Sequence, residues 1–196
     1  MDVSRETRAD LEHYADLISK WSPKINLVAK STLKDVWARH IIDSIQVYRA
    51  APSFSAWADL GSGGGMPGLV AAIIAKHENP EARFVLVESD GRKATFCKTV
   101  IRELSLCAEV KVERIEEAAA LGADIVSARA LAPLYRLLGF AERHLRSGGT
   151  AVFPKGADWE KEVTESLETW CFNMEKITSQ TEPAAAILRI RDIERV

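Results

Sequence analysis

Residues 56–68, AWADLGSGGGMPG, decide the fold of this chain. Residues 56–60 are a short and mostly apolar run, which indicates a buried β-strand. A glycine-rich turn follows at 61–65, and Pro67 suits the first position of a helix, where no amide donor is needed. Glycine is required where the backbone approaches a ligand closely or takes a positive φ. The stretch therefore predicts a strand and a helix joined by a ligand-binding turn.

The glycines of this turn fit two patterns, each typical of a different ligand. Gly61, Gly63 and Gly65 form G-x-G-x-G directly after the strand, which is typical of class I methyltransferases. Residues 63–68 also satisfy G-x-G-x-x-G, the dinucleotide pattern, but two residues separate that pattern from the strand. Asp59 favours the methyltransferase, because a carboxylate attracts the cationic amino acid end of S-adenosylmethionine and repels a pyrophosphate. An NAD-type nucleotide-binding protein remains the alternative.

Short apolar runs alternate with helical patterns beyond this stretch. The further predicted strands are 83–88, 108–113, 123–128 and 149–155. The predicted helices are 67–77, 90–104, 131–145 and 158–169. The last two apolar runs, 171–178 and 184–191, predict an antiparallel hairpin at the sheet edge. Together these elements predict an α/β, Rossmann-like class I methyltransferase fold with a mostly parallel seven-stranded sheet.

Two helical patterns precede the first strand. Residues 4–21 carry apolar side chains at helical spacing, and we expect Pro23 to stop this helix. A second pattern starts at Ser31 or Thr32, either of which can cap it, and ends before Pro52. The predicted division is a helical N-terminal extension packed on the core, 1–52, and a cofactor-binding core, 53–196.

Composition excludes several classes of protein. The three cysteines are odd in number and form no C-x-x-C, which argues against a disulfide framework and a zinc site. The N-terminus is polar, and the longest apolar run, 69–75, is far shorter than the roughly 20 residues of a membrane span. We therefore expect a cytoplasmic protein without membrane contact. Because the net charge is −2, any RNA contact must come from a local basic patch.

Further candidate residues lie where the other strands end. Glu88 can accept hydrogen bonds from both ribose hydroxyls of an adenosine cofactor, with a solvated strand end as the alternative. Ile115 and Glu116 follow the third strand, in a loop that lies against adenine in methyltransferase-like folds. Glu116 is equally well explained as a surface charge. Arg129 ends the fourth strand, where it can grip a phosphate or carboxylate or form a structural salt bridge.

Seven motifs in chain order carry a resemblance to a known family. They are WSPKINLVA (21–29), RHIIDSIQV (39–47), DLGSGGGMPGL (59–69), VLVESDGRKATFCKTV (85–100), ERIEE (113–117), SARALAPL (127–134) and FPKG (153–156). On these motifs the chain resembles the RsmG family, also called glucose-inhibited division protein B, of bacterial 16S rRNA (guanine-N7)-methyltransferases. No family motif lies beyond residue 156.

The resemblance implies a cofactor, a substrate and a set of site residues. The cofactor is S-adenosylmethionine, with S-adenosylhomocysteine as product, and the partner is 16S rRNA or the small ribosomal subunit. The implied target is guanine 527, in the 530 loop. The cofactor-site residues carried over by position are Gly61, Met66, Ile115, Glu116 and Arg129. No protein partner is implied, and we expect a monomer.

Methylation of guanine N7 demands little of the protein beyond positioning. N7 is already a lone-pair nucleophile and the methyl donor is an activated sulfonium, so alignment, which can contribute about 7–11 kcal/mol, is the main requirement. We therefore predict no catalytic triad and no metal ion. Arg129, Lys155 and His40 are the candidate catalytic residues. Lys155 can contact an RNA phosphate or guanine O6, and His40 is otherwise explained as a satisfied buried histidine.

The RNA patch must be assembled from scattered basic residues. The candidates are Lys30, Lys34, Arg39, Arg92, Lys93, Lys98, Arg129, Arg136 and Lys155. A charged helix face is often merely solvated, so these residues do not by themselves identify the substrate. The acidic balance of the chain keeps a small-molecule methyltransferase as the alternative.

Overall fold

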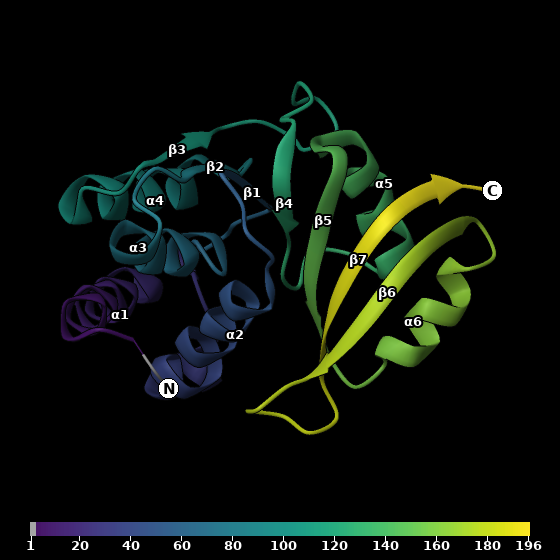
Figure 1. Ribbon diagram of the computed structural model, residues 1–196. Coiled ribbons are helices and arrows are strands. Elements are labelled where there is room, and N and C mark those ends of the chain that lie inside the picture. Colours follow the sequence, from purple (N-terminus) through teal and green to yellow (C-terminus); the bar gives the residue numbers. More distant parts are fainter. Residues whose placement is uncertain (1–2) are drawn as a thin grey trace.

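A seven-stranded sheet organises the molecule in a computed structural model, which describes residues 3–196 and all their side chains except those of Lys30 and Lys34. In spatial order the strands are β3 (Ala108–Lys111), β2 (Arg83–Val87), β1 (Ala56–Leu60), β4 (Ala123–Ser127), β5 (Leu145–Lys155), β7 (Ala186–Arg195) and β6 (Trp170–Thr178). The pairs from β3 to β5 are parallel, and the β6–β7 hairpin is antiparallel at the edge (Figure 1). The predicted Rossmann-like α/β fold is confirmed.

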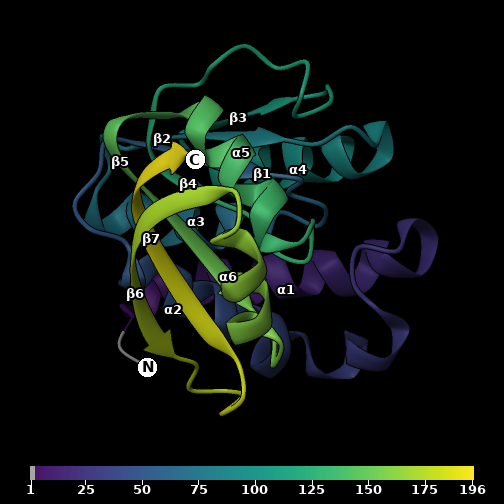
Figure 2. The same cartoon turned by 90° about the vertical axis from the view of Figure 1, so that its right-hand side faces the viewer.

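Helices cover both faces of the sheet. One face carries α1 (Arg5–Ile25), α2 (Ile42–Ala50), α3 (Gly68–Glu78) and α4 (Gly91–Leu104), and the other carries α5 (Leu134–His144) and α6 (Trp159–Ser166) (Figure 1). The run 69–75 of α3 is buried along its whole length, which explains why it has no polar face. Figure 2 shows α6 beside the hairpin, where Lys176 of β6 lies 4.6 Å over the ring of Trp159.

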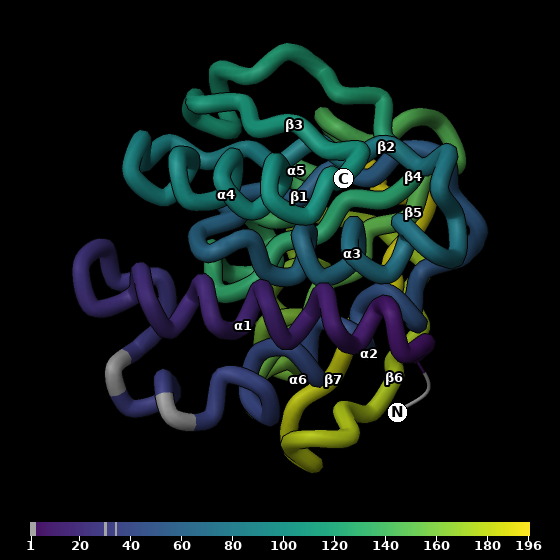
Figure 3. Tube along the Cα trace, turned by 90° about the vertical axis from the view of Figure 1, so that its left-hand side faces the viewer, coloured from purple at the N-terminus to yellow at the C-terminus, as the bar shows by residue number. Residues whose placement is uncertain are grey.

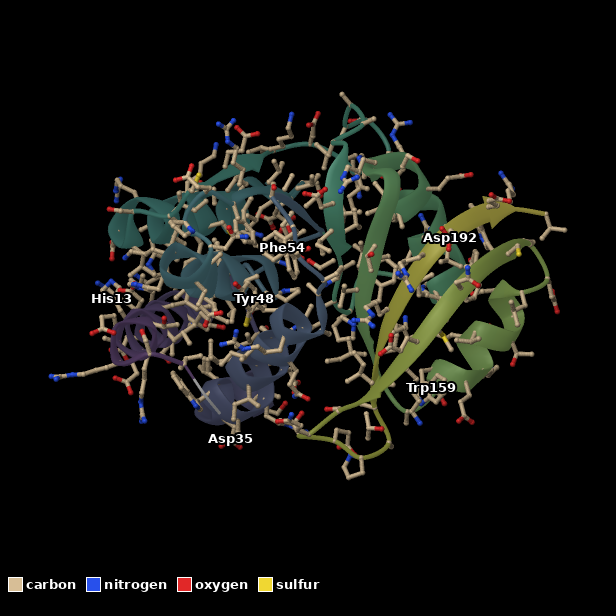
Figure 4. The ribbon with its side chains drawn as sticks, viewed as in Figure 1. His13, Asp35, Tyr48, Phe54, Trp159 and Asp192 are labelled. Carbon is tan, nitrogen blue, oxygen red and sulfur yellow. The ribbon has the colours of Figure 1, made fainter. Side chains whose placement is uncertain are left out.

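Aromatic packing joins the N-terminal helices to the sheet. Tyr48 of α2 and Phe54 meet edge to face with ring centroids 5.9 Å apart (Figure 4). Both rings also pack against Trp57 of β1. Because α1, α2 and α3 share one apolar core, a boundary between extension and core at residue 52 stays a prediction.

The first helix is longer than predicted, and the expected stop at Pro23 is wrong. α1 continues to Ile25 and runs along the outside of its layer (Figure 3). A proline so close to the end removes only one N–H from the helix ladder. The helix ends instead at Asn26, whose φ of 51° is left-handed and whose N–H donates to the Ser22 carbonyl.

The second helical pattern is not one regular helix, which corrects the prediction. It divides into a 3₁₀ segment, η1 (Lys30–Asp35), a π-helical segment, η2 (Trp37–Ile41), and α2. Ala29 occupies the cap position, and the hydroxyl of Thr32 instead donates to the Ala29 carbonyl. π-helical turns are rare in proteins, but those that occur are often found at functional sites. This one contains His40.

Several later boundaries also differ from the prediction, and the two largest differences at the start of an element concern α5 and β5. The fifth helix begins at Leu134 rather than residue 131, because Pro133 precedes it and the Glu162 carboxylate accepts the Leu134 N–H at 2.7 Å. The fifth strand begins at Leu145 rather than residue 149, although Gly148 and Gly149 lie inside it. Neither difference moves the ends of the strands that carry the candidate residues.

Candidate active site

Two cavities open where the parallel strands end. The first, here the glycine-loop cavity, has a volume of about 390 Å³ and is lined by Gly61, Gly63, Glu88, Lys93, Ile115, Glu116 and Arg136 among others. The second, here the hairpin cavity, has a volume of about 540 Å³, with Arg39, His40, Asp43, Arg129, Lys155 and Thr181 in its wall. Ala130, three residues after the end of β4, lines both. In doubly wound sheets, ligands bind at this edge.

Three side chains contact the glycine loop, and the space beside Gly63 is open. The Gly63 N–H donates to Oε2 of Glu88 at 2.7 Å, and the Cys97 thiol lies 3.6 Å from the Gly63 carbonyl. Tyr14 of α1 donates to the Gly64 carbonyl at 2.5 Å. Gly63 has a φ of 55°, and a Cβ built there would meet only one atom, 3.9 Å away. The missing side chain of Gly63 therefore leaves room for a ligand.

Glu88 combines burial with spare hydrogen-bonding capacity. Its side chain lies at the end of β2, where the residue is 8% exposed. Oε2 accepts the Gly63 N–H and Oε1 accepts the Asp90 N–H, each at 2.7 Å. A carboxylate oxygen has two lone pairs. Each oxygen can therefore still accept one hydroxyl from a ligand in the cavity that Glu88 lines.

The loop after β3 forms the opposite wall of the glycine-loop cavity. Ile115 is buried, and its carbonyl accepts a hydrogen bond from the buried His144 at 3.2 Å. Arg143 donates twice to the carbonyl of Ala118 in the same loop. Glu116 is exposed and lies 3.6 Å from Arg136. The end of α5 thus fixes an apolar side chain and a backbone segment against the cavity.

Asp59 is buried behind the glycine loop rather than inside the cavity. Its Oδ1 accepts the Ser127 hydroxyl at 2.6 Å, whereas Oδ2 has no hydrogen-bond partner among the described residues. Burial raises the pKa of Asp59 to about 6. Gly65 and Met66 are buried as well, and none of these three predicted cofactor residues lines either cavity.

Arg129 and His40 meet in the wall of the hairpin cavity. The Arg129 guanidinium donates to Nδ1 of His40 at 3.1 Å and lies 3.5 Å from the Met66 sulfur. A guanidinium only donates, so Nδ1 accepts and the Nε2–H of His40 donates to Thr32 Oγ1 at 2.8 Å. Burial, together with the charges of Arg129 and Arg39, lowers the pKa of His40 to about 4. His40 is therefore a neutral acceptor at neutral pH.

Arg129 forms no ion pair with the side chains that the structure describes, so the structural salt bridge that was the alternative explanation is absent among them. Lys155 is paired: its Nζ lies 2.6 Å from Glu162 and 3.2 Å from the Ala132 carbonyl. Of the two cations, Arg129 is the one without an anionic partner in this part of the chain.

The turn between β6 and β7 contributes wall residues that the sequence did not indicate. Thr181, Glu182 and Ala185 of this turn line the hairpin cavity, together with Ile187 of β7. The sheet register explains why, because antiparallel pairing places Ala186 beside Lys155. A hairpin predicted at this edge could have led to the same placement if its partner strand and register had been known.

The predicted basic candidates do not all face the cavities. Arg39, Lys93, Arg129, Arg136 and Lys155 line one cavity or the other. Arg92 pairs with Asp90, and Lys98 lines neither cavity. The side chains of Lys30 and Lys34 lie outside the described residues.

Neither metal-binding clusters nor membrane spans occur among the described elements. Within residues 3–196, no group of three or more histidine, cysteine or acidic side chains is arranged to hold a metal ion. In the same range, no helix combines the length and the apolar character needed to cross a bilayer. All three cysteines are unpaired thiols.

Comparisons with known proteins point to one family. The family model described as rRNA small subunit methyltransferase G matches residues 7–187. The Ribosomal RNA small subunit methyltransferase G of Ruegeria pomeroyi is 55% identical over 196 residues, covering 100% of this chain and 96% of that protein. The protein of the same name from Cereibacter sphaeroides is 48% identical over 198 residues, covering 100% and 95%.

Solved structures with low identity share the fold. A SAM-dependent methyltransferase from Aquifex aeolicus has a TM-score of 0.61 at 9% identity, covering 83% of this chain and 97% of that one. A methyltransferase from Geobacter sulfurreducens has a TM-score of 0.61 at 15% identity, covering 97% and 92%. At these identities the likeness concerns the fold alone.

Proposed function

The chain belongs to the rRNA small subunit methyltransferase G family, and from that premise we propose that it methylates N7 of a guanine in 16S rRNA with S-adenosylmethionine. We propose guanine 527, in the 530 loop, as the target. Relatives bearing the family name match over the full chain at 48% and 55% identity. The observation that carries the proposal is the meeting of two cavities at Ala130, because a donor in one can reach an acceptor in the other.

The glycine-loop cavity is the proposed adenosine site. Glu88 accepts the ribose hydroxyls with its remaining lone pairs, and Ile115 packs against adenine beside Glu116. Gly61 and Gly63 let the backbone approach the ligand, which fits the open space beside Gly63.

The amino acid end of the cofactor lies, in this proposal, between Asp59 and Arg129. Asp59 has an orphaned carboxylate oxygen and Arg129 has no anionic partner among the described residues. A carboxylate and a guanidinium together match an α-amino acid, which carries one charge of each sign. Met66 acts indirectly by contacting the Arg129 guanidinium, and Gly65 lets the helix begin close behind the loop.

The residues of the hairpin cavity then position the acceptor base. S-adenosylmethionine, when bound, supplies an activated methyl group, so the protein need not remove a proton from N7. His40, neutral and fixed in one tautomer, orients Arg129 rather than acting as a base. Lys155, held by Glu162, presents its remaining N–H toward the cavity for guanine O6 or a phosphate. We further propose a cytoplasmic monomer that needs no metal ion.

Methylation of small subunits tests this function. Purified protein, treated with a chelator, is incubated with labelled S-adenosylmethionine and either naked 16S rRNA or small subunits that lack the modification. We expect label in one guanine, mapped by nuclease digestion and mass spectrometry, with N7 as the modified atom. Absence of label from rRNA in both forms would exclude the proposed substrate and favour a small-molecule acceptor.

A further inference from the structure

We propose that Asp43 reads the Watson–Crick edge of the target guanine in the hairpin cavity and stabilises the charge that methylation creates. The inference rests on the proposed function. It adds a specificity-determining residue on α2, which carries none of the predicted catalytic or cofactor residues.

Asp43 is held in a fixed orientation with one oxygen available. Its Oδ1 accepts the hydroxyl of Thr181, from the turn between β6 and β7, and lies 3.5 Å from the Gln46 amide nitrogen. Both hydrogen bonds that Asp43 accepts from the described side chains use Oδ1, and none reaches Oδ2. The residue is half-buried and lines the hairpin cavity. A carboxylate oriented by two neutral donors keeps its full negative charge for a ligand.

The two other acidic residues that line this cavity are not both fixed in orientation and free of a cationic partner. Glu162 is neutralised by Lys155 at 2.6 Å, and the same oxygen accepts the Leu134 N–H. Glu182 is exposed on the turn. Asp43 has no cation within 4 Å among the described side chains. Its charge does act on Arg129, where it opposes the lowering of the Arg129 pKa by burial.

Guanine chemistry matches this arrangement. Its N7 and O6 atoms are acceptors on one edge, whereas N1–H and the N2 amino group are donors on the next edge. If N7 faces the donor across Ala130, the cation Lys155 suits O6, and an acceptor is needed at the adjacent wall. A carboxylate there accepts from both N1–H and N2–H. Adenine presents a lone pair at N1, which the same carboxylate repels.

The transfer itself strengthens this contact. The N7 lone pair forms the new N–C bond, the S–C bond breaks with its electron pair left on sulfur, and the positive charge moves from the sulfonium to the purine. A cationic purine is a stronger N1–H donor and is attracted to the Asp43 carboxylate. An interaction that is stronger in the transition state raises kcat, not only affinity.

Replacing Asp43 with asparagine tests the charge while keeping an oxygen for Thr181. We expect Asp43→Asn to lower kcat/KM for small subunits about 10- to 100-fold, the range for a hydrogen bond to a charged group, with S-adenosylhomocysteine affinity unchanged. Asp35→Asn is the matched control, because Asp35 is exposed in η1 and lines neither cavity (Figure 4). We expect that variant to turn over within about twofold of the unmodified protein.

Base discrimination separates recognition from a structural role. Small subunits are reconstituted with 16S rRNA that carries inosine, which lacks the N2 amino group, at the mapped target. The unmodified protein should prefer guanine about tenfold or more, and Asp43→Asn should lose that preference. Normal turnover by Asp43→Asn, an unmodified protein indifferent to inosine, or preserved discrimination in the variant would each overturn the assignment. If the unmodified protein labels no rRNA, the proposed function itself fails.

Discussion

At the scale of single residues, Gly63 is the loop glycine whose substitution tests the cofactor site most directly. It combines a φ of 55° with a missing side chain that faces the glycine-loop cavity. Gly63→Val should cost about 1–2 kcal/mol of stability through backbone strain and should raise the Kd for S-adenosylhomocysteine more than about tenfold. Calorimetry and thermal melting measure the two effects. Gly122→Val is the control, because Gly122 has a φ of 60° and nothing within 4 Å. Equal affinities in both variants would place the cofactor elsewhere.

Arg129 is expected to act on a ligand carboxylate. Because it lacks an ion pair among the described residues, Arg129→Ala should lower the melting temperature little. The Kd for S-adenosylhomocysteine should rise about 10- to 100-fold, the value of a charge-assisted pair. Methylthioadenosine, which has no amino acid end, should bind both proteins equally. Loss of methylthioadenosine binding in Arg129→Ala would show that the guanidinium serves another part of the site.

Asp59 should make the ligand-free protein less stable as pH rises. Burial raises its pKa from 3.8 to about 6 in the folded protein, so folding favours the protonated form. That stabilisation is present below pH 4 and is lost as pH rises through 6. Over this window it amounts to about 3 kcal/mol.

Comparison with Asp59→Asn isolates the effect. Unfolding in denaturant is measured from pH 4 to 7 for both proteins. The depressed pKa of His40 acts in the opposite direction in this window, but it is common to both and cancels in the difference. Saturating S-adenosylhomocysteine should flatten the difference, since its amino group would stabilise the Asp59 carboxylate. Parallel pH profiles without ligand would contradict the raised pKa.

At the scale of elements, α1 supports the glycine loop through one hydroxyl. Tyr14 is 0% exposed and donates to the Gly64 carbonyl. Tyr14→Phe leaves that buried carbonyl without its partner, which should cost about 1–3 kcal/mol of stability and weaken S-adenosylhomocysteine binding severalfold. Tyr135→Phe removes an exposed hydroxyl and should change neither quantity. Urea unfolding and calorimetry measure both; unchanged binding in Tyr14→Phe would show that α1 does not support the loop.

The sequence predicted the strands and helices of the core better than the helical segments that precede the core in the chain. β1 was predicted residue for residue, because a short apolar run bounded by glycine has few alternatives. The end of α1 was misplaced because proline is a strong stop only in the interior of a helix, and Asn26 gave no comparable signal. The η1 and η2 segments were missed because their apolar spacing resembles that of an α-helix.

The candidate site was only partly predictable for a different reason. Gly61, Gly63 and Glu88 follow strands in sequence, so their common edge could be deduced from a parallel sheet. Thr181 reaches the hairpin cavity through the antiparallel register of β7 on β5, which local patterns do not encode. Asp43 and His40 depend on the path of the N-terminal helices across the sheet.

At the scale of the whole molecule, the hairpin cavity is shared by distant parts of the chain. α2 and the turn before β7 are joined by the contact of Asp43 with Thr181 and by a 2.7 Å hydrogen bond from the Gln180 N–H to Gln46. The first and last quarters of the chain thus build one wall. The segments that build this wall lie inside the stretch over which the Ruegeria pomeroyi relative matches, which covers the full chain.

Recognition of RNA by a chain with a net charge of −2 requires the cations to be concentrated near the cavities. Arg39 is exposed and lines the hairpin cavity, so under the proposed function we expect it to contact a phosphate beside the target base. Arg39→Ala should lower kcat/KM for small subunits most at low salt. Its slope of log kcat/KM against log salt should be shallower by about 0.7–0.9, the contribution of one phosphate.

The matched control is Arg191→Ala, in the second half of β7. Arg191 is exposed, and the register places its neighbour Ile190 beside Ala151, toward the start of β5 and away from Lys155. Its salt slope should equal that of the unmodified protein. Binding of S-adenosylhomocysteine should be unaffected in both variants, since neither arginine lines the glycine-loop cavity. Equal slopes for the two variants would mean that RNA approaches from another face, because only an arginine in contact with phosphate changes the number of ions released.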